Sequence, residues 1–445
     1  MIKVKKAVIE MSGQKEYSCM TKDKLMTYTF ISLITLAVIT IVLWWPVTYA
    51  DWSLGLTLAI TCVISVVISV VLDYLLSVAM KEKGPLNTMS AAVFGLIVAL
   101  SYSLGMPAMM MNEVLPLIAP QAFLYVAIMA AVGMIVFKKL QGLLGRKYVN
   151  PAAAAKILVL IPFLYEVLLP KDHFSMINLA APVGYGDPTF FAETLQSCYL
   201  PAGYTSDVFW TLLVAKYHGW PGGASSIAVI IVGICLFIVA YKYIKWRITA
   251  SYLAATTVFS MIMYVVYGGD ALLRLCFHLF VGSSIFLAFF MATDPATTPL
   301  TYSGQCIFGF GLGVLTVLMQ TYMNFLGGSI LALVIMNLTS PLLDRAGLQK
   351  PIEEKVEKKL PKGKQFETIK TTSCIRCGAC MVVCCHNLSP ILIKEAFDKG
   401  NSKVLKKLRA DLCDGCGNCT FVCPARIDLR NFTLRAKASL RTAKN

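Results

Sequence analysis

The sequence contains few charged residues. Aspartate, glutamate, lysine and arginine make up 14% of its 445 residues, whereas hydrophobic residues make up 57% and the mean hydropathy is +0.69. Soluble domains carry roughly 25% charged residues, so most of this chain is expected to lie in a membrane. Acidic residues are scarcer than basic ones, and the net charge is +16.

Three further absences exclude whole classes of protein. Only four histidines are present, and the apolar segments offer no convincing histidine pair for haem. No G-x-G-x-x-G fingerprint occurs in the context that binds a dinucleotide, so nicotinamide binding by this chain alone is not expected. Six cysteines are scattered without the pairing pattern of a small secreted disulfide scaffold. They are Cys19, Cys62, Cys198, Cys235, Cys276 and Cys306.

Long apolar runs dominate the first three quarters of the chain. About 17–25 apolar residues cross the hydrocarbon core of a bilayer, and about ten segments qualify. The first 24 residues are polar and basic, so the first run is predicted to be a transmembrane helix and no cleavable signal peptide is expected. The segments are Leu25–Val47, Leu54–Met80, Ala91–Leu104, Leu115–Phe137, Ala152–Leu169, Ser226–Tyr243, Ile248–Tyr267, Ala271–Ala292, Cys306–Tyr322 and Gly327–Leu343.

The basic residues between these segments predict an orientation. They concentrate in the N-terminal segment, in Lys81–Lys83, Lys138–Lys147 and Lys242–Arg247, and from Arg345 onward, which all lie on one side if the number of spans is even. Connections rich in lysine and arginine face the cytoplasm. We therefore expect a multi-pass membrane protein with both termini in the cytoplasm.

The predicted fold class is an all-α polytopic membrane protein with a helical cytoplasmic domain that holds two iron–sulfur clusters. Residues 1–24 form a cytoplasmic segment, 25–346 the transmembrane domain, 347–371 a linker and 372–445 the cluster domain. Residues 170–224 form a long loop on the outer side, and loops of this length are usually functional.

The cluster prediction rests on two cysteine runs with the spacing C-x2-C-x2-C-x3-C. This spacing is typical of [4Fe–4S] clusters, and in two-cluster ferredoxins the fourth cysteine binds the other cluster. A pair of structural zinc sites is the alternative, but such sites usually use two separated cysteine pairs. We therefore assign Cys374, Cys377, Cys380 and Cys423 to one cluster and Cys413, Cys416, Cys419 and Cys384 to the other.

Two features of the cluster domain remain open. Cys385 stands where a proline often follows the fourth ligand, and it is either a bystander or an alternative ligand. Residues 350–445 contain 20 lysines and arginines but 9 acidic residues. This basic charge suits either anionic lipid or an acidic redox partner, and nucleic acid is not expected. Ile391–Leu408, between the two runs, has helical spacing.

Four ionisable residues fall inside the predicted spans, where such residues mark ion paths or buried pairs. Asp73, about two turns from the cytoplasmic end of its helix, is the candidate for an ion path. Lys156 and Arg274 are expected to extend to the nearby interface, and His278 to be a satisfied core residue. Gly309, Gly311 and Gly313 suggest close helix packing.

Four stretches of the membrane part resemble a known family. They are Gly145–Pro151, Gly222–Ser226, Phe290–Thr301 with the sequence FMATDPATTPLT, and Met336–Arg345. The chain from about residue 20 to 346 resembles the D subunit of Rnf electron-transport complexes, which is related to the B subunit of sodium-pumping NADH:quinone reductases. The resemblance implies ten transmembrane helices, a place among other Rnf-type membrane subunits and a location in a prokaryotic inner membrane.

The resemblance also implies flavin. The family attaches FMN to the threonine of an S-G-A-T motif in the outer loop, and Ala202–Ser206 occupies that place here, with Thr205 as the attachment residue. Ala202 and Tyr204 depart from the motif. A second, non-covalent flavin is implied by analogy.

The cysteine-rich tail resembles the ferredoxin module of the Rnf C subunit, without the flavin- and NADH-binding part. The expected function is therefore a translocase subunit, not catalytic alone, that relays electrons between a cytosolic ferredoxin or NADH-linked oxidoreductase and membrane flavins. About 30 Å of hydrocarbon separates the two predicted ends of this route, so further carriers are expected in between. Coupling to Na⁺ or H⁺ is expected. The alternatives are a non-pumping membrane anchor that relays electrons to an external reductase, and a solute transporter with a redox-sensing tail.

Overall fold

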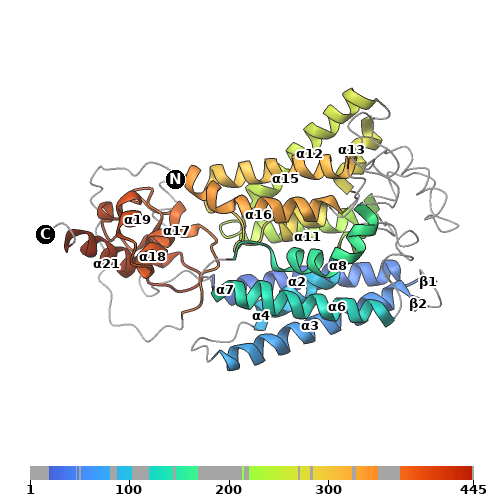
Figure 1. Ribbon diagram of the computed structural model, residues 1–445, viewed down its shortest axis with the longest axis horizontal. Coiled ribbons are helices and arrows are strands. Elements are labelled where there is room, and N and C mark those ends of the chain that lie inside the picture. Colours follow the sequence, from blue (N-terminus) through green and yellow to red (C-terminus); the bar gives the residue numbers. More distant parts are fainter. Residues whose placement is uncertain are drawn as a thin grey trace. The chain divides into compact units, whose positions relative to one another are not determined.

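A computed structural model gives the fold of the chain (Figure 1). The structure describes residues 20–46, 48–49, 52–80, 88–102, 120–143, 147–168, 213–214, 220–268, 271–280, 284–322, 327–348 and 371–442. The chain divides into two compact units. We call the unit of Met26–Glu82 and Leu86–Asp344 the membrane unit, and residues 371–442 of the other unit the cysteine module.

The described part of the membrane unit is helical apart from one short hairpin, in which β1 (Thr48–Tyr49) pairs antiparallel with β2 (Trp52–Ser53). Two of its helical segments are π-helices, η2 and η7. The helices in chain order are α2 (Lys22–Trp44), α3 (Leu54–Ala79), α4 (Thr88–Leu100), α6 (Pro120–Val132), η2 (Gly133–Leu140), α7 (Gln141–Leu143), α8 (Pro151–Leu168), η5 (Pro221–Gly223), α11 (Ser226–Ala240), α12 (Trp246–Tyr267), α13 (Ala271–Phe280), α14 (Ser284–Phe286), η7 (Leu287–Met291), α15 (Tyr302–Tyr322) and α16 (Gly328–Ala346).

Helical structure occurs in each of the ten predicted segments. Among the described residues, six helices are long and apolar enough to cross a membrane. A seventh span results if Arg274–Phe280 and Ser284–Met291, which are bent by 52° relative to each other, count as one. The chain is therefore a multi-pass helical membrane protein, and the total of ten spans stays a prediction.

Short polar side chains fix where several helices begin. Ser53 accepts a hydrogen bond from the Leu56 backbone N–H at the start of α3, and Ser225 accepts one from Ala228 at the start of α11. Asn150 accepts from the N–H groups of Ala152 and Ala153 and so caps α8. Such caps satisfy backbone donors that have no partner inside the helix.

Close packing joins α12 and α15, which lie next to each other in Figure 1. A Cβ atom on Gly309 would lie 2.4 Å from the Ile248 carbonyl oxygen, and one on Gly313 would lie 2.8 Å from that of Tyr252. These glycines let the backbones of α12 and α15 approach each other, as small residues do in membrane bundles. The packing predicted for Gly309 and Gly313 is confirmed.

The cysteine module is also helical. Its helices are α17 (Ala379–Val382), α18 (Pro390–Asp398), α19 (Ser402–Lys407), η8 (Ala410–Leu412), α20 (Asn418–Phe421) and α21 (Leu429–Thr442). The predicted helix over Ile391–Leu408 is two helices, because Gly400 adopts a left-handed φ of 64° and Asn401 caps α19. Leu388, Ile393 and Ala436 belong to the hydrophobic core that joins α18 to α21.

Candidate functional site

The cysteine module is an internal repeat in which every cysteine of the first run corresponds to the cysteine 39 positions later. The backbone repeats as well as the cysteines. Three pairs of equivalent residues all have positive φ angles, between 51° and 79°, and these reverse the chain around each cysteine run. The pairs are Arg376 and Gly415, Gly378 and Gly417, and Asn387 and Arg426.

The equivalent helices confirm this repeat at the level of hydrogen bonds. α17 and α20 each begin after the left-handed glycine of their motif, so that the third cysteine of each run lies in a helical turn. After the fourth cysteine the chain turns again and enters α18 or α21. The Asn387 N–H donates to the Cys384 carbonyl oxygen, just as Arg426 donates to Cys423.

Thiols of one cysteine run lie near thiols of the other run. The Cys374 side chain is close enough to Cys423 for an electrostatic interaction, and Cys380 interacts with Cys374, Cys377, Cys419 and Cys423. In the other half, Cys419 interacts with Cys413, Cys416 and Cys384. The fourth cysteine of each run thus lies near the first and third cysteines of the other run.

Burial controls the chemistry of these thiols. It raises the pKa of Cys419 to about 12, and the charges of Cys413 and Cys416 contribute to this rise. Burial also raises the pKa values of Cys380 and Cys384. A buried thiol therefore favours its neutral form, unless it binds a metal, which deprotonates it.

The donor set of the module fits iron–sulfur clusters. The Arg376 backbone N–H lies 3.3 Å from the Cys374 Sγ and donates to it, as expected around a cluster-binding sulfur. In the described part of the chain, no three Cys, His, Asp or Glu side chains gather as they would around a single metal ion.

Other polar residues brace the two cysteine runs. Arg376 is buried and forms an ion pair with Glu395 of α18. His386, next to the first run, lies 3.5 Å from Asp414 of the second run. Cys385 receives a contact from the Asn418 side-chain amide, whose nitrogen lies 3.7 Å from its Sγ. Cys385 is thus in contact with the second half of the repeat.

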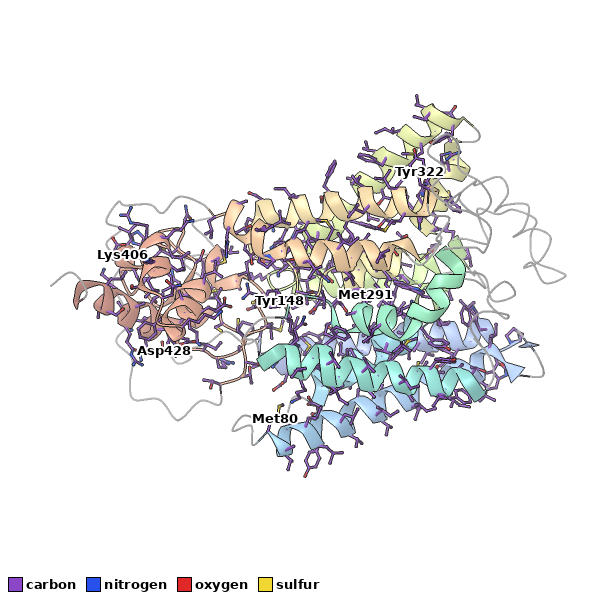
Figure 2. The ribbon with its side chains drawn as sticks, in the orientation of Figure 1. Met80, Tyr148, Met291, Tyr322, Lys406 and Asp428 are labelled. Carbon is purple, nitrogen blue, oxygen red and sulfur yellow. The ribbon has the colours of Figure 1, made fainter. Side chains whose placement is uncertain are left out.

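A second candidate site lies in the membrane unit, where residues of two other family stretches hold the 292–301 loop. The Asn150 side-chain amide donates to the Met291 carbonyl oxygen, at 3.2 Å, and Ser340 donates to that of Thr297, at 2.8 Å. The Asp344 carboxylate accepts from the Leu300 N–H at 2.6 Å. Tyr148 and Met291 mark this site in Figure 2.

Lys245 holds the 292–301 loop from the start of α12. Its ammonium group is buried and donates to the carbonyl oxygens of Pro295 and Thr298, each at 2.9 Å, and to the Thr298 hydroxyl, at 3.0 Å. In the sequence, Lys245 is visible only as one of the basic residues that predict the orientation. Its role as an anchor leaves no local signal, because Pro295 is fifty residues away in the sequence.

Asp73 is in a buried ion pair. Its carboxylate lies 3.2 Å from the ammonium group of Lys139 in η2, which also donates to Ser77 at 2.7 Å. Lys147, between α7 and α8, interacts with Asp294 and Asp73. Its pKa is lowered because burial outweighs the attraction of these two carboxylates. These contacts favour a buried ion pair over an ion path as the role of Asp73.

The expectation that Lys156 and Arg274 extend to the interface is wrong. Lys156 is buried, donates to the Ser101 carbonyl oxygen and lies 4.1 Å from the centroid of the Trp220 ring. Arg274 is also buried. Both face the inside of the bundle, since their helices present them to neighbouring helices instead of to lipid. Thr205 and its motif lie outside the described residues.

The two sites define the class of the chain, a multi-pass helical membrane protein with a thiol-rich module. The model of the NQR2, RnfD, RnfE family matches residues 19–353, so the chain belongs to this family. Residues 354–445, with both cysteine runs, lie beyond the match.

The relatives belong to ion-translocating oxidoreductase complexes. The D subunit of the Na⁺-translocating ferredoxin:NAD⁺ oxidoreductase complex of Acetobacterium woodii is 27% identical over 266 residues, which are 60% of this chain and 73% of that protein. The B subunit of the Na⁺-translocating NADH-quinone reductase of Pseudoalteromonas atlantica is 28% identical over 52% of this chain and 56% of its own length. The D subunit of the proton-translocating ferredoxin:NAD⁺ oxidoreductase complex of Clostridium ljungdahlii is 25% identical over 49% of this chain and 66% of its own length.

Proposed function

We propose that this chain is a membrane component of an Rnf-type complex and carries electrons through two [4Fe–4S] clusters. They pass between a cytosolic ferredoxin or NADH-linked oxidoreductase and flavins in the membrane. The observation that carries the proposal is the place of the fourth cysteine of each run, which lies near cysteines of the other run in the 39-residue repeat. It occurs in a chain whose relatives are subunits of such complexes.

The proposed ligands follow from the thiol neighbours. Cys374, Cys377, Cys380 and Cys423 hold one cluster, and Cys413, Cys416, Cys419 and Cys384 hold the other. Bound clusters supply one-electron transfer. The protein supplies buried sulfurs, the Arg376 N–H donor to Cys374 and a rigid frame held by the ion pair between Arg376 and Glu395.

The relatives support coupling to ion movement but leave two candidate ions. The Acetobacterium woodii relative is named as Na⁺-translocating and the Clostridium ljungdahlii relative as proton-translocating. We propose that the chain works with other Rnf-type membrane subunits in a prokaryotic inner membrane. Its basic tail lies in the cytoplasm, beside anionic lipid or an acidic redox partner.

Iron content tests the two clusters. We expect purified full-length chain, isolated without oxygen, to contain about eight iron atoms and eight acid-labile sulfides, because each [4Fe–4S] cluster contributes four of each. Elemental analysis and electron paramagnetic resonance of the reduced protein measure this. A zinc content of about two atoms without iron would overturn the proposal in favour of structural zinc sites.

The flavin prediction is tested by the mass of the outer-loop peptide that contains Thr205. We propose that FMN is bound there through a phosphoester, so the peptide from active complex is expected to carry the added mass of FMN. Thr205→Ala is expected to remove this mass and the in-gel fluorescence of the chain. Ser206→Ala is the matched control and should retain both, because only the neighbouring hydroxyl changes. An unmodified Thr205 peptide from fully active complex rejects the assignment.

A further inference from the structure

A chain of buried polar side chains lies beside the bend between α13 and α14. His278 of α13 is fully buried, and its Nδ1 lies 3.0 Å from the side-chain oxygen of Gln320 in α15. The Gln320 amide nitrogen donates in turn to the Ser284 hydroxyl, at 3.5 Å. The Tyr252 hydroxyl of α12 lies beside the hydroxyls of Ser284 and Thr316. Four helical segments thus contribute to one polar path.

The hydrogen bonds determine the tautomer of His278. The amide oxygen of Gln320 only accepts, so the Nδ1 of His278 carries the hydrogen and its Nε2 carries a lone pair. In the described part of the chain, this Nε2 has no hydrogen-bond partner. Buried polar atoms nearly always have a partner. A lone pair without one therefore indicates a functional role for His278. His278 is thus a core residue as expected, but among the described residues only its Nδ1 has a partner.

Further polar atoms on α12, α15 and α16 lack a partner among the described residues. They are the hydroxyls of Ser260 in α12, Thr321 in α15 and Ser329 in α16, and all three residues are buried. Water molecules or a passing ion usually satisfy such groups. The break of 52° in the span strengthens this interpretation, because interrupted helices border ion sites in transporters.

The charges around His278 disfavour a resident metal cation. Arg274 lies one turn before it on α13 and repels positive charge. α14, η7 and α15 contain no charged residue, and α12 contains only Arg247, in its first turn. A resident Na⁺ would therefore find no carboxylate on these elements. Arg274 also disfavours a lasting imidazolium, so a proton taken up at the Nε2 lone pair is held only transiently and is released again.

We infer that His278 is a proton-transfer residue on an ion path through the membrane unit, with Gln320 as its positioning residue. Uptake of a proton at Nε2 converts the imidazole to imidazolium, and release of the proton restores it, so no electron is moved by His278. This inference rests on the proposed function, because it names a residue through which the coupled ion passes.

The test uses the complete complex in phospholipid vesicles, with electron flow and proton uptake measured together. In His278→Asn the amide still donates to Gln320 but offers no imidazole nitrogen. We expect proton uptake per electron to fall about 100-fold, the lower range for a lost acid–base group. Electron flow in the presence of an ionophore should stay within about twofold, since chemistry at the clusters needs no acid–base group here.

Two further variants complete the test. Gln320→Leu should lower proton uptake per electron at unchanged uncoupled electron flow, which a purely structural residue would not do. Cys276→Ala, at another buried position of α13, is the control and should behave as wild type. Normal proton uptake by His278→Asn, or wild-type complex that transports Na⁺ but no protons, overturns the inference and leaves the proposed function standing. Wild-type complex that transports no ion overturns the coupling itself and favours a non-pumping anchor.

Discussion

Cys423→Ser and Cys377→Ser are expected to lose the same iron–sulfur cluster, although the two cysteines belong to different runs. Cys384→Ser and Cys416→Ser should likewise both lose the other cluster. The reason is the exchange across the repeat, in which Cys423 lies near Cys374 and Cys380, and Cys384 near Cys413 and Cys419.

Each of these substitutions should reduce electron flow through the complex by at least about 100-fold, since even partners of metal ligands cost about 10–100-fold. Redox titration followed by electron paramagnetic resonance identifies the cluster that each variant retains. Cys385→Ser is the matched control, because it removes a thiol beside Cys384 that is not a proposed ligand, and it should retain all of the iron of the wild type. If Cys423→Ser instead matches Cys416→Ser, each run binds its own cluster and the exchange is wrong.

Lys139→Met is expected to destabilise the membrane unit by about 3–5 kcal/mol, the cost of breaking a buried ion pair by removing one partner. The Asp73 carboxylate is only 2% exposed and would lose the ammonium group that lies 3.2 Å away. The double variant Asp73→Asn, Lys139→Met should recover most of this loss. The thermal midpoint of the purified complex in detergent measures the effect.

Lys138→Met serves as the control for this pair, because the Lys138 ammonium group donates to the neutral carbonyl oxygen of Ser90. Lys138→Met should lower the thermal midpoint of the complex much less than Lys139→Met does. The same variants test the ion-path role predicted for Asp73. If the double variant is stable but no longer transports the coupled ion, Asp73 belongs to the path and the purely structural interpretation is contradicted.

The sequence predicted the helical class, the positions of the ten helical segments and the cysteine runs, because each leaves a local signal. A run of apolar residues or a fixed cysteine spacing is visible without knowledge of the fold. The glycines of α15 were equally visible, since Gly309 and Gly313 form a regular spacing on one helix.

Residues that act through distant partners could not be predicted. Lys139 looked like one more positive charge at the cytoplasmic side, and only the π-helix η2 and its packing against α3 place it beside Asp73. Gln320 gave no signal as the partner of His278, which is 42 residues away. The break at Gly400 was missed because the apolar spacing of Ile391–Leu408 continues through it.

The 39-residue repeat has a consequence for how the cysteine module assembles. In the proposed ligand assignment, each cluster takes three thiols from one half of the module and the fourth from the other half, as in a domain-swapped dimer joined into one chain. Cutting the chain between α18 and α19 would therefore not yield a stable one-cluster fragment. Iron loading is expected to be all-or-none, since the first cluster to form draws together the two halves that the second cluster needs.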